Sequence, residues 1–136
     1  MFLLDPQLEQ GSHFIDDLEL SQLRLQNDSR YPWVLLIPRI ASAIEIIDLN
    51  EEQSHLLMQE IRSVSQILRT DFPCDKINVA SLGNKVRQLH VHLIARRFND
   101  PAWPGAVWDK GKPVPYDDSL LNNRFTVFKN GFRSGA

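Results

Sequence analysis

Apolar and polar residues alternate from Gln22 to Gln26, and turn-forming residues follow directly. This alternation has the period of a half-buried strand, and residues 27–29, Asn-Asp-Ser, are typical of a turn. The next run, Trp33–Ile37, favours a strand and is closed by Pro38. The pattern therefore predicts a hairpin of two central strands.

A long amphipathic helix is predicted for residues 51–70. Asn50 can cap its first turn, where two acidic residues are favourable. Steps of three and four residues join the members of one apolar stripe: Leu57, Ile61, Val64 and Leu68. Phe72-Pro73 ends the pattern. Residues 43–47, which precede the helix, are predicted to continue the sheet or to cross its edge.

Two further strands are predicted after the helix, at residues 76–80 and 86–95, with a loop at 81–85 between them. The order is then β-β-α-β-β. Short connections favour antiparallel neighbours with the helix packed on one face of the sheet, which is an α+β fold. Residues 1–19 have no clean period, and we treat them as an extension that precedes a core at 20–97.

The chain after Arg97 is rich in Pro, Gly and Trp, which predicts a surface loop. Residues 118–129 are predicted to form a final helix. A chain of 136 residues is too short for two full cores, so we predict a single domain over residues 1–136.

Composition excludes several classes of protein. Hydrophobic residues make up 43% and charged residues 24%, as in an ordinary soluble domain. No apolar run approaches the roughly 20 residues of a membrane-spanning helix. The first ten residues lack the plan of a secretory signal, which predicts a cytoplasmic protein. The single cysteine, Cys74, cannot form an internal disulfide, and we interpret it as an unreactive thiol.

The charge of the chain is unevenly distributed. Its net value of −2 does not provide the broad basic surface that duplex nucleic acid requires. Residues 1–95 carry eight basic and thirteen acidic groups, whereas residues 96–136 carry seven and four. The basic excess is consistent with a solvated tail and equally with a small anionic ligand.

The segment with the clearest chemistry is Gln-Leu-His-Val-His at residues 88–92. On a strand, Gln88, His90 and His92 would share one face. Three interpretations of this spacing are open: a polar sheet face, part of a metal site that needs further ligands, or nucleophilic attack on phosphorus by a neutral imidazole. In the last, the loop Gly83-Asn84-Lys85 would supply donors to a phosphate.

Several landmarks occur in a fixed order between Leu23 and Gly105. They are a turn with Asn27, a strand that ends Leu36-Ile37-Pro38-Arg39, an amphipathic helix, Asn78 at a strand end, the Gly83-Asn84 loop, the histidine strand closed by Arg96, and Trp103-Pro104-Gly105. In this order they resemble the histidine triad (HIT) superfamily of nucleotide hydrolases and transferases. The resemblance implies a HIT-like α+β fold.

The resemblance also implies a mechanism. HIT enzymes attack the α-phosphorus of a nucleotide with the middle histidine of a His-x-His-x-His strand, and they hydrolyse or transfer the resulting nucleotidyl-histidine. By position, His90 is the nucleophile, and His92 assists at the phosphate oxygens and the leaving group. Gln88 replaces the first histidine, so it can form hydrogen bonds but cannot carry a proton.

A fourth histidine, usual in many members, falls at Trp33. The phosphate contact made there would then be weakened or come from Lys85 or Arg96. By resemblance, Asn27 or less favourably Asp28 meets the ribose hydroxyls. The remaining implied ligands to sugar or phosphate are Asn78, Gly83, Asn84 and Lys85. Plain turn and strand-end chemistry explains Asn27 and Asn78 equally well.

Trp103 repeats a family feature in which this segment reaches the active site of a partner subunit, although it can also pack its own loop. The segment has too little regular structure to pack on its own subunit, so we expect it to cross a two-fold interface.

The predicted protein is a homodimer that cleaves a purine nucleotide conjugate, such as a phosphoramidate or dinucleoside polyphosphate. The alternative is a nucleotide-binding module with little or no turnover. No cofactor is expected, although Mg²⁺ can accompany a polyphosphate substrate. Nucleic acid and membranes are not expected partners.

Overall fold

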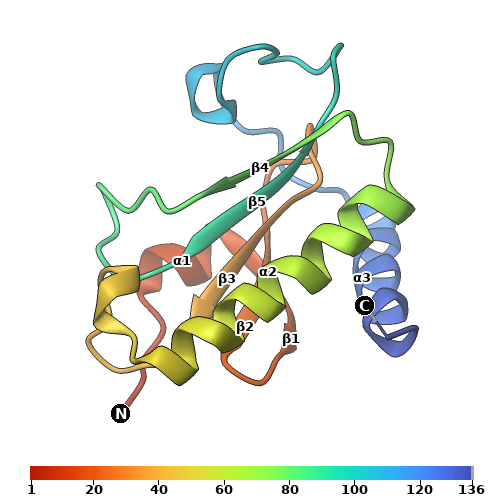
Figure 1. Cartoon of the computed structure of the whole chain (residues 1–136). Coiled ribbons are helices and arrows are strands. Elements are labelled where there is room, and N and C mark those ends of the chain that lie inside the picture. Colours follow the sequence, from red (N-terminus) through yellow and green to blue (C-terminus); the bar gives the residue numbers. More distant parts are fainter. Residues whose placement is uncertain (136) are drawn as a thin grey trace.

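A computed structural model describes residues 1–135 (Figure 1). Five strands and three α-helices make up its regular structure, together with two short 3₁₀ segments at Ile46–Asp48 and Val107–Asp109. In chain order the elements are α1 (Pro6–Gln10), β1 (Ser12–Asp17), β2 (Ser21–Gln26), β3 (Trp33–Pro38), α2 (Glu51–Asp71), β4 (Lys76–Ala80), β5 (Val91–Arg96) and α3 (Asp118–Arg133).

The strands form one antiparallel sheet in the order β1-β2-β3-β5-β4. The predicted hairpin is confirmed as β2 and β3, in which Leu23 lies opposite Leu36. The last strand, β5, is inserted between β3 and β4, so His92 has Leu35 on one side and Ala80 on the other. This arrangement confirms the α+β fold class.

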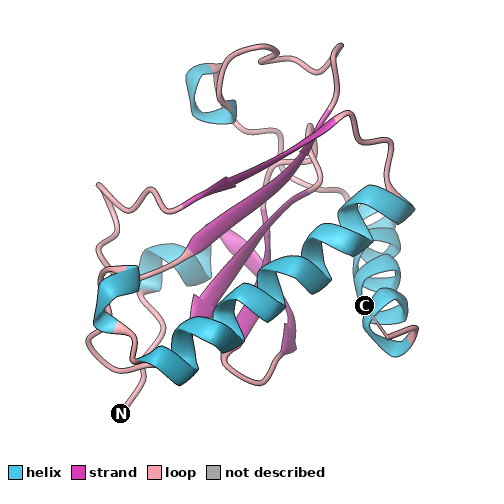
Figure 2. Ribbon diagram, viewed as in Figure 1, coloured by secondary structure: helices cyan, strands magenta, loops and turns pink. Residues whose placement is uncertain are grey.

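The predicted long helix, α2, lies across one face of the sheet (Figure 1). Asn50 Oδ1 accepts from the Gln53 N–H at 2.9 Å, and Gln53 Oε1 accepts from the Asn50 N–H at 2.9 Å, which is a capping box. Leu57, Val64 and Leu68 of the predicted stripe are buried. The final helix, α3, runs beside the C-terminal half of α2 and extends beyond the predicted end (Figure 2).

The other face of the sheet has a second, smaller core. Trp33, Leu35 and Ile37 of β3 and Ile94 of β5 point to this side, because alternate strand residues face opposite ways. The short helix α1 and irregular parts of the chain cover it: Leu8 of α1 and Val107 of the loop after β5 are buried there, and Phe2 and Leu4 pack against it. The face that carries the histidines is therefore closed by segments from both ends of the chain.

Residues 1–19 are not an extension outside the sheet. β1 pairs with β2 as an edge strand, and its register shifts between Phe14 and Asp16. Such a bulge interrupts the period of two, and this accounts for the missing alternation in the sequence. Residues 43–47 also differ from the prediction: they form no strand, and their last two residues belong to the short 3₁₀ segment Ile46–Asp48.

The predicted strand at 86–95 begins five residues later than expected, at Val91. Its partner β4 ends at Ala80, opposite His92, so the residues before Val91 have no ladder on that side. The segment after Arg97 packs on its own chain, so the expectation that it has too little regular structure to do so is wrong, while its crossing of a two-fold interface stays a prediction. Val107 is 3% exposed, and the Gly105 carbonyl accepts from Arg96 Nη2 at 2.8 Å.

Candidate functional site

The two histidines of the predicted motif lie side by side at the start of β5. Their ring centroids are 4.8 Å apart with the planes steeply inclined at 68°, and each residue is 5% exposed. His92 belongs to the strand, whereas His90 immediately precedes it. The prediction that the two imidazoles share one face is thus confirmed, although only His92 lies within the regular strand.

The protonation of His90 follows from its hydrogen bond. Nδ1 lies 2.7 Å from the main-chain carbonyl oxygen of Gln88. A carbonyl oxygen can only accept, so Nδ1 donates and carries the proton. In the neutral ring the lone pair is then on Nε2, the nitrogen that an imidazole nucleophile needs.

His92 has the opposite tautomer. The indole Nε1–H of Trp33 donates to His92 Nδ1 at 3.1 Å, and an indole nitrogen is only a donor, so the proton of the neutral ring is on Nε2. His92 Nε2 faces the Leu82 carbonyl at 3.4 Å. Burial, together with the neighbouring His90, lowers the pKa of His92 to about 4. His92 is therefore a neutral donor near pH 7.

Trp33 has a different place from the one expected. The prediction treated it as a weakened phosphate contact, but its single donor is directed to His92 and the side chain is 5% exposed. Trp108, for which no functional role was predicted, lies against the rings of His92 and Trp33. Its ring centroid is 4.9 Å from that of His92 and 5.7 Å from that of Trp33. An aromatic wall thus shields one side of His92.

A small cavity of about 130 Å³ opens beside His90. Four predicted residues line it, namely Gly83, Asn84, Gln88 and His90 itself. The other lining residues were not predicted: Ile44, Glu45, Ser81, Arg87 and Leu89. A Cβ atom at Gly83 would lie 2.7 Å from the Val86 carbonyl oxygen and 3.5 Å from His90 Cε1. A side chain at this position would clash with the Val86 carbonyl, so the loop could not keep this conformation.

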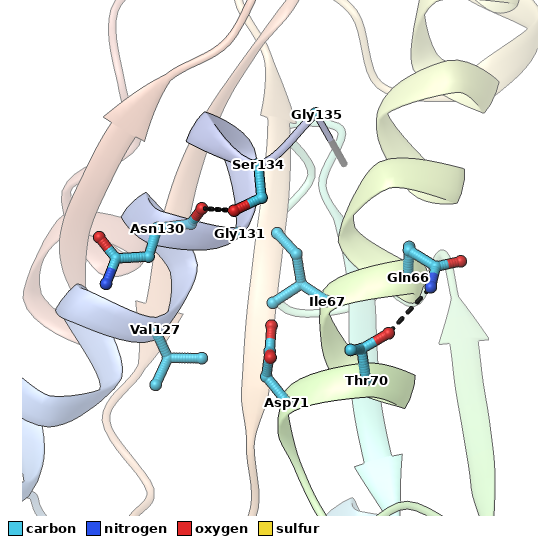
Figure 3. Close-up of a pocket in the computed structure, with 9 residues that line it drawn as sticks. All are labelled: Gln66, Ile67, Thr70, Asp71, Val127, Asn130, Gly131, Ser134 and Gly135. Carbon is cyan, nitrogen blue, oxygen red and sulfur yellow. Dashed lines mark hydrogen bonds between the residues drawn. The ribbon is translucent and has the colours of Figure 1, made fainter.

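Lys85 is exposed and is not part of this lining, whereas Arg87 is. The volume is below the roughly 300–1,000 Å³ of pockets that enclose a drug-sized ligand. It suits a group the size of a phosphate. A larger groove of about 490 Å³ lies between α2 and α3, but Asp71 is its one titratable lining residue, and it contains neither histidine (Figure 3).

The Gln88 side chain points to the N-terminal segment. Its Oε1 accepts from the Asp5 N–H and its Nε2 donates to the Leu3 carbonyl oxygen, both at 2.8 Å. The contact of Gln88 with His90 is instead made through its main chain. The first position of the motif therefore contacts His90 through its main-chain carbonyl, which its side-chain type does not reveal.

Arg96 is not available to a phosphate, so that prediction is wrong. It is 1% exposed, and it donates to both carboxylate oxygens of Asp100 at 2.7 and 2.9 Å. It also donates to Asn78 Oδ1 and to the Gly105 carbonyl oxygen, each at 2.8 Å. Burial, the largest single cause, opposes ionisation of Asp100, but the hydrogen bonds and charge of Arg96, together with the main-chain N–H groups of Arg97 and Trp103, hold the pKa of Asp100 below its ordinary value. Arg96 fastens the following loop to the sheet.

The other predicted sugar and phosphate ligands lie outside the cavity lining. Asn27 Oδ1 accepts from the Tyr116 N–H at 3.0 Å, and Asn78 Oδ1 is occupied by Arg96. Asp28 is 1% exposed and forms an ion pair with Arg30 at 2.9 Å. These contacts agree with the turn and strand-end explanation, and the ligand roles stay predictions.

Trp103 packs on its own chain. Its ring centroid is 5.2 Å from that of Phe98, and the Arg96 guanidinium lies 5.5 Å from it. It is not among the residues that line the cavity beside His90. The sequence left open whether Trp103 packs its own loop, and in the described residues it does.

The remaining features concern metal ligands, membrane-spanning helices and the single cysteine. Across the described residues, no three His, Cys, Asp or Glu side chains are grouped as a metal site would require. In the same part of the chain, no helix has the length and apolar character to cross a bilayer. Burial raises the pKa of the Cys74 thiol, which supports its interpretation as unreactive.

Comparison with known families identifies residues 7–99 as a HIT domain. The chain belongs to the HIT family. Solved structures of histidine triad proteins are similar over nearly the whole length of this HIT protein. One from Bradyrhizobium japonicum is 44% identical, with 96% of this chain and 97% of that chain covered and a TM-score of 0.93.

Two further structures agree. A HIT protein from Sinorhizobium meliloti is 40% identical, with 96% of each chain covered and a TM-score of 0.93. A histidine triad protein from Marinobacter aquaeolei is 39% identical, with 100% of this chain and 99% of that chain covered and a TM-score of 0.95. No curated protein matches the chain. Membership of the family supports nucleotide binding and hydrolase or transferase chemistry of the HIT type.

Proposed function

We propose that this HIT protein is a nucleotide hydrolase or nucleotidyl transferase that acts at the α-phosphorus of a purine nucleotide conjugate. The observation that supports it most is the hydrogen bond from His90 Nδ1 to the Gln88 carbonyl, which leaves a lone pair on Nε2. The His90 ring lies beside a second imidazole, and His90 lines a cavity of phosphate size.

In the proposed reaction, His90 Nε2 attacks the α-phosphorus, and the bond from phosphorus to the leaving group breaks. The leaving group departs with the bonding electron pair and takes up a proton. Water or an acceptor then attacks the nucleotidyl-histidine, the phosphorus–nitrogen bond breaks, and His90 is restored. The products of hydrolysis are a nucleoside monophosphate and the free leaving group.

His92 is proposed to donate its Nε2–H to a phosphate oxygen or to the leaving group. With a pKa of about 4, His92 is neutral near pH 7 in the free protein, so it carries no second proton that it could transfer. Negative charge on a bound phosphate would raise that pKa, because an opposite charge nearby favours the protonated form. His92 would thus gain a proton that it can transfer only with substrate bound and with the Trp33 N–H turned away from Nδ1; otherwise its Nε2–H acts as a hydrogen-bond donor.

The negative charge of a phosphate is stabilised by hydrogen-bond donors, and residues that line the cavity can supply them. The main-chain amides of Gly83 and Asn84 and the guanidinium of Arg87 are the proposed contacts. Arg87 takes the place that the resemblance gave to Lys85. No cofactor is needed for the attack by His90, and Mg²⁺ would enter only with a polyphosphate substrate.

A cavity of about 130 Å³ leaves the base and the leaving group of a conjugate on the surface around it. We propose a two-fold homodimer in which the partner's loop after β5 covers that surface. Phe98 and Trp108 of this loop are 67% and 39% exposed, so the loop offers apolar area to such a partner. The predicted partner-site role of Trp103 belongs to the same proposal.

The proposal is tested by incubating the protein with adenylated and guanylated compounds, namely phosphoramidates, dinucleoside polyphosphates and nucleotidyl esters. Release of nucleoside monophosphate, with a transient adduct on His90 detected by mass spectrometry of the quenched protein, is expected. The second candidate, a binding module without turnover, is favoured by the buried, neutral state of His92. It predicts saturable nucleotide binding with no adduct and no release.

A further inference from the structure

The N-terminal segment makes a specific contact with the histidine motif. The Gln88 amide oxygen accepts from the Asp5 N–H and the amide nitrogen donates to the Leu3 carbonyl oxygen, at 2.8 Å each. The segment is held in place from the other side as well, because Leu8 is buried in the second core and Phe2 and Leu4 pack against it. The contact therefore joins two ordered parts of the molecule.

The same residue supports the proposed nucleophile through its carbonyl oxygen, which accepts from His90 Nδ1 at 2.7 Å. Residues 86–90 precede β5 and have no strand partners that would define this carbonyl. The next residue gives one fixed point, since the Leu89 N–H donates to the Ala43 carbonyl at 3.0 Å. The Gln88 side chain supplies a second fixed point on the other side of the peptide.

We propose that Gln88 is a positioning residue, and that the main chain of Leu3–Asp5 sets the orientation and tautomer of His90 through it. The inference rests on the proposed function of His90 as nucleophile. The side-chain amide of Gln88 substitutes for a neighbouring strand: it pairs with a peptide and thereby fixes its own carbonyl. The N-terminal segment has no residue in the cavity lining, so it acts on His90 only through its main chain and through Gln88.

The contact can be removed at Asp5 without touching Gln88. Asp5 has φ of −59°, the value that proline imposes, so Asp5→Pro deletes the N–H donor without a change of φ. Asp5 also caps α1 by accepting from the Gln7 N–H at 2.8 Å. Asp5→Ala loses this cap but keeps the main-chain donor. The two variants therefore differ at the donor to Gln88.

Gln88 itself provides the second test. Gln88→Met keeps the length of the side chain and removes both hydrogen bonds, whereas Gln88→Glu keeps the acceptor and loses the donor to Leu3. A capping variant far from the site, Gln53→Ala, serves as a control for general destabilisation. Thermal unfolding of every variant shows which comparisons are made on folded protein.

Two readouts are used: long-range ¹H–¹⁵N spectra that report the tautomer of His90, and steady-state kinetics on the best substrate. We expect Asp5→Pro and Gln88→Met to mix the two tautomers of His90 and to lower kcat about 10- to 100-fold, the range for residues that orient a catalytic group. KM should stay within about threefold. Gln88→Glu should lie between them and the parent. Asp5→Ala and Gln53→Ala should match the parent in both readouts.

The inference is overturned if Asp5→Pro and Asp5→Ala give the same His90 spectrum and the same kcat. It is also overturned if Gln88→Met, folded as the parent is, leaves the tautomer unchanged. The spectra need no turnover, so they decide the matter even for a protein that only binds nucleotide. A failure of the proposed function is instead seen as absent nucleotide release with the His90 tautomer intact.

Discussion

The two faces of the sheet are covered in different ways. On one face, α2 packs with a regular apolar stripe, and the core there contains Leu57, Val64 and Leu68. On the other face, irregular segments from both ends of the chain close over Trp33, His92 and Ile94. The regular cover contributes stability, whereas the irregular cover surrounds the proposed chemistry. A rigid sheet with loops at one face can position reactive groups while a helix on the other face supplies the core.

The largest expected effect is on the histidine face. His90→Ala should lower turnover by at least about 1,000-fold, because it removes the nucleophile and with it the covalent step. Nucleotide affinity should stay within about tenfold, because few ground-state contacts are lost. Release of nucleoside monophosphate and equilibrium binding measure the two quantities. A variant with parental turnover would exclude His90 as the nucleophile.

The matching experiment on the helix face is Leu68→Ala. Leu68 is 0% exposed, so the truncation should lower the free energy of unfolding by about 2–5 kcal/mol. Urea denaturation at neutral pH measures the loss. The kcat per folded molecule should change less than twofold. A large fall in kcat with intact fold would show that the two faces are coupled more closely than their separate covers suggest.

The buried state of His92 should appear in the pH dependence of stability. Its pKa is about 4 in the folded protein and near 6.5 when unfolded. The unfolded chain therefore binds the proton first, and stability falls as the pH drops from about 6.5 toward 4, by about 3 kcal/mol in all. His92→Gln should lack this part of the loss. Urea denaturation of both proteins at pH 7 and pH 4.5 makes the comparison, and parallel losses would contradict the low pKa.

Trp33 should matter through its N–H rather than through its size. Trp33→Phe keeps an aromatic ring in the second core but removes the donor to His92 Nδ1. We expect both tautomers of His92 in ¹⁵N spectra and a fall in kcat of about tenfold. Leu35→Val, on the same face, is a control for imperfect packing. A Phe variant with the parental His92 spectrum would show that the Leu82 carbonyl alone sets the tautomer.

The smallest effect is expected for Trp108, which is 39% exposed. Trp108→Ala should admit water to His92 and raise its pKa from about 4 toward its ordinary value, since burial is the largest cause of the shift. Stability should change little, because the residue is at the surface. An NMR titration of His92 between pH 3 and 8 measures the pKa. An unchanged value would mean that Trp33 and the sheet provide the desolvation by themselves.

The helix and strand with a clear hydrophobic period could be predicted from the sequence. The stripe of α2, its Asn50 cap and the alternation in β2 are local patterns, because each depends on residues a few positions apart. The pairing of His90 with His92 on one face also follows from spacing, since the two are only two residues apart. The resemblance to the HIT family named the correct fold from landmarks in order.

Contacts between residues far apart in the chain could not be predicted from the sequence. Trp33 meets His92 across 59 positions, Gln88 meets Leu3 across 85, and Asn27 meets Tyr116 across 89. Each uses a polar group that is equally suited to a ligand, so residue type alone could not assign it. The edge strand β1 was hidden for a related reason, because its bulge is compensated by pairing with β2 rather than by any local pattern.

The sequence by itself determined which residues are candidates for catalysis and which elements form the main core, because hydrophobic periodicity and imidazole chemistry are properties of short segments. The tertiary structure decided the tautomers of both histidines, the low pKa of His92 and the loss of Arg96 to an internal ion pair. Those properties depend on which partner occupies each hydrogen-bonding group and on how much water is excluded. Both are set only when segments from opposite ends of the chain meet on one face of the sheet.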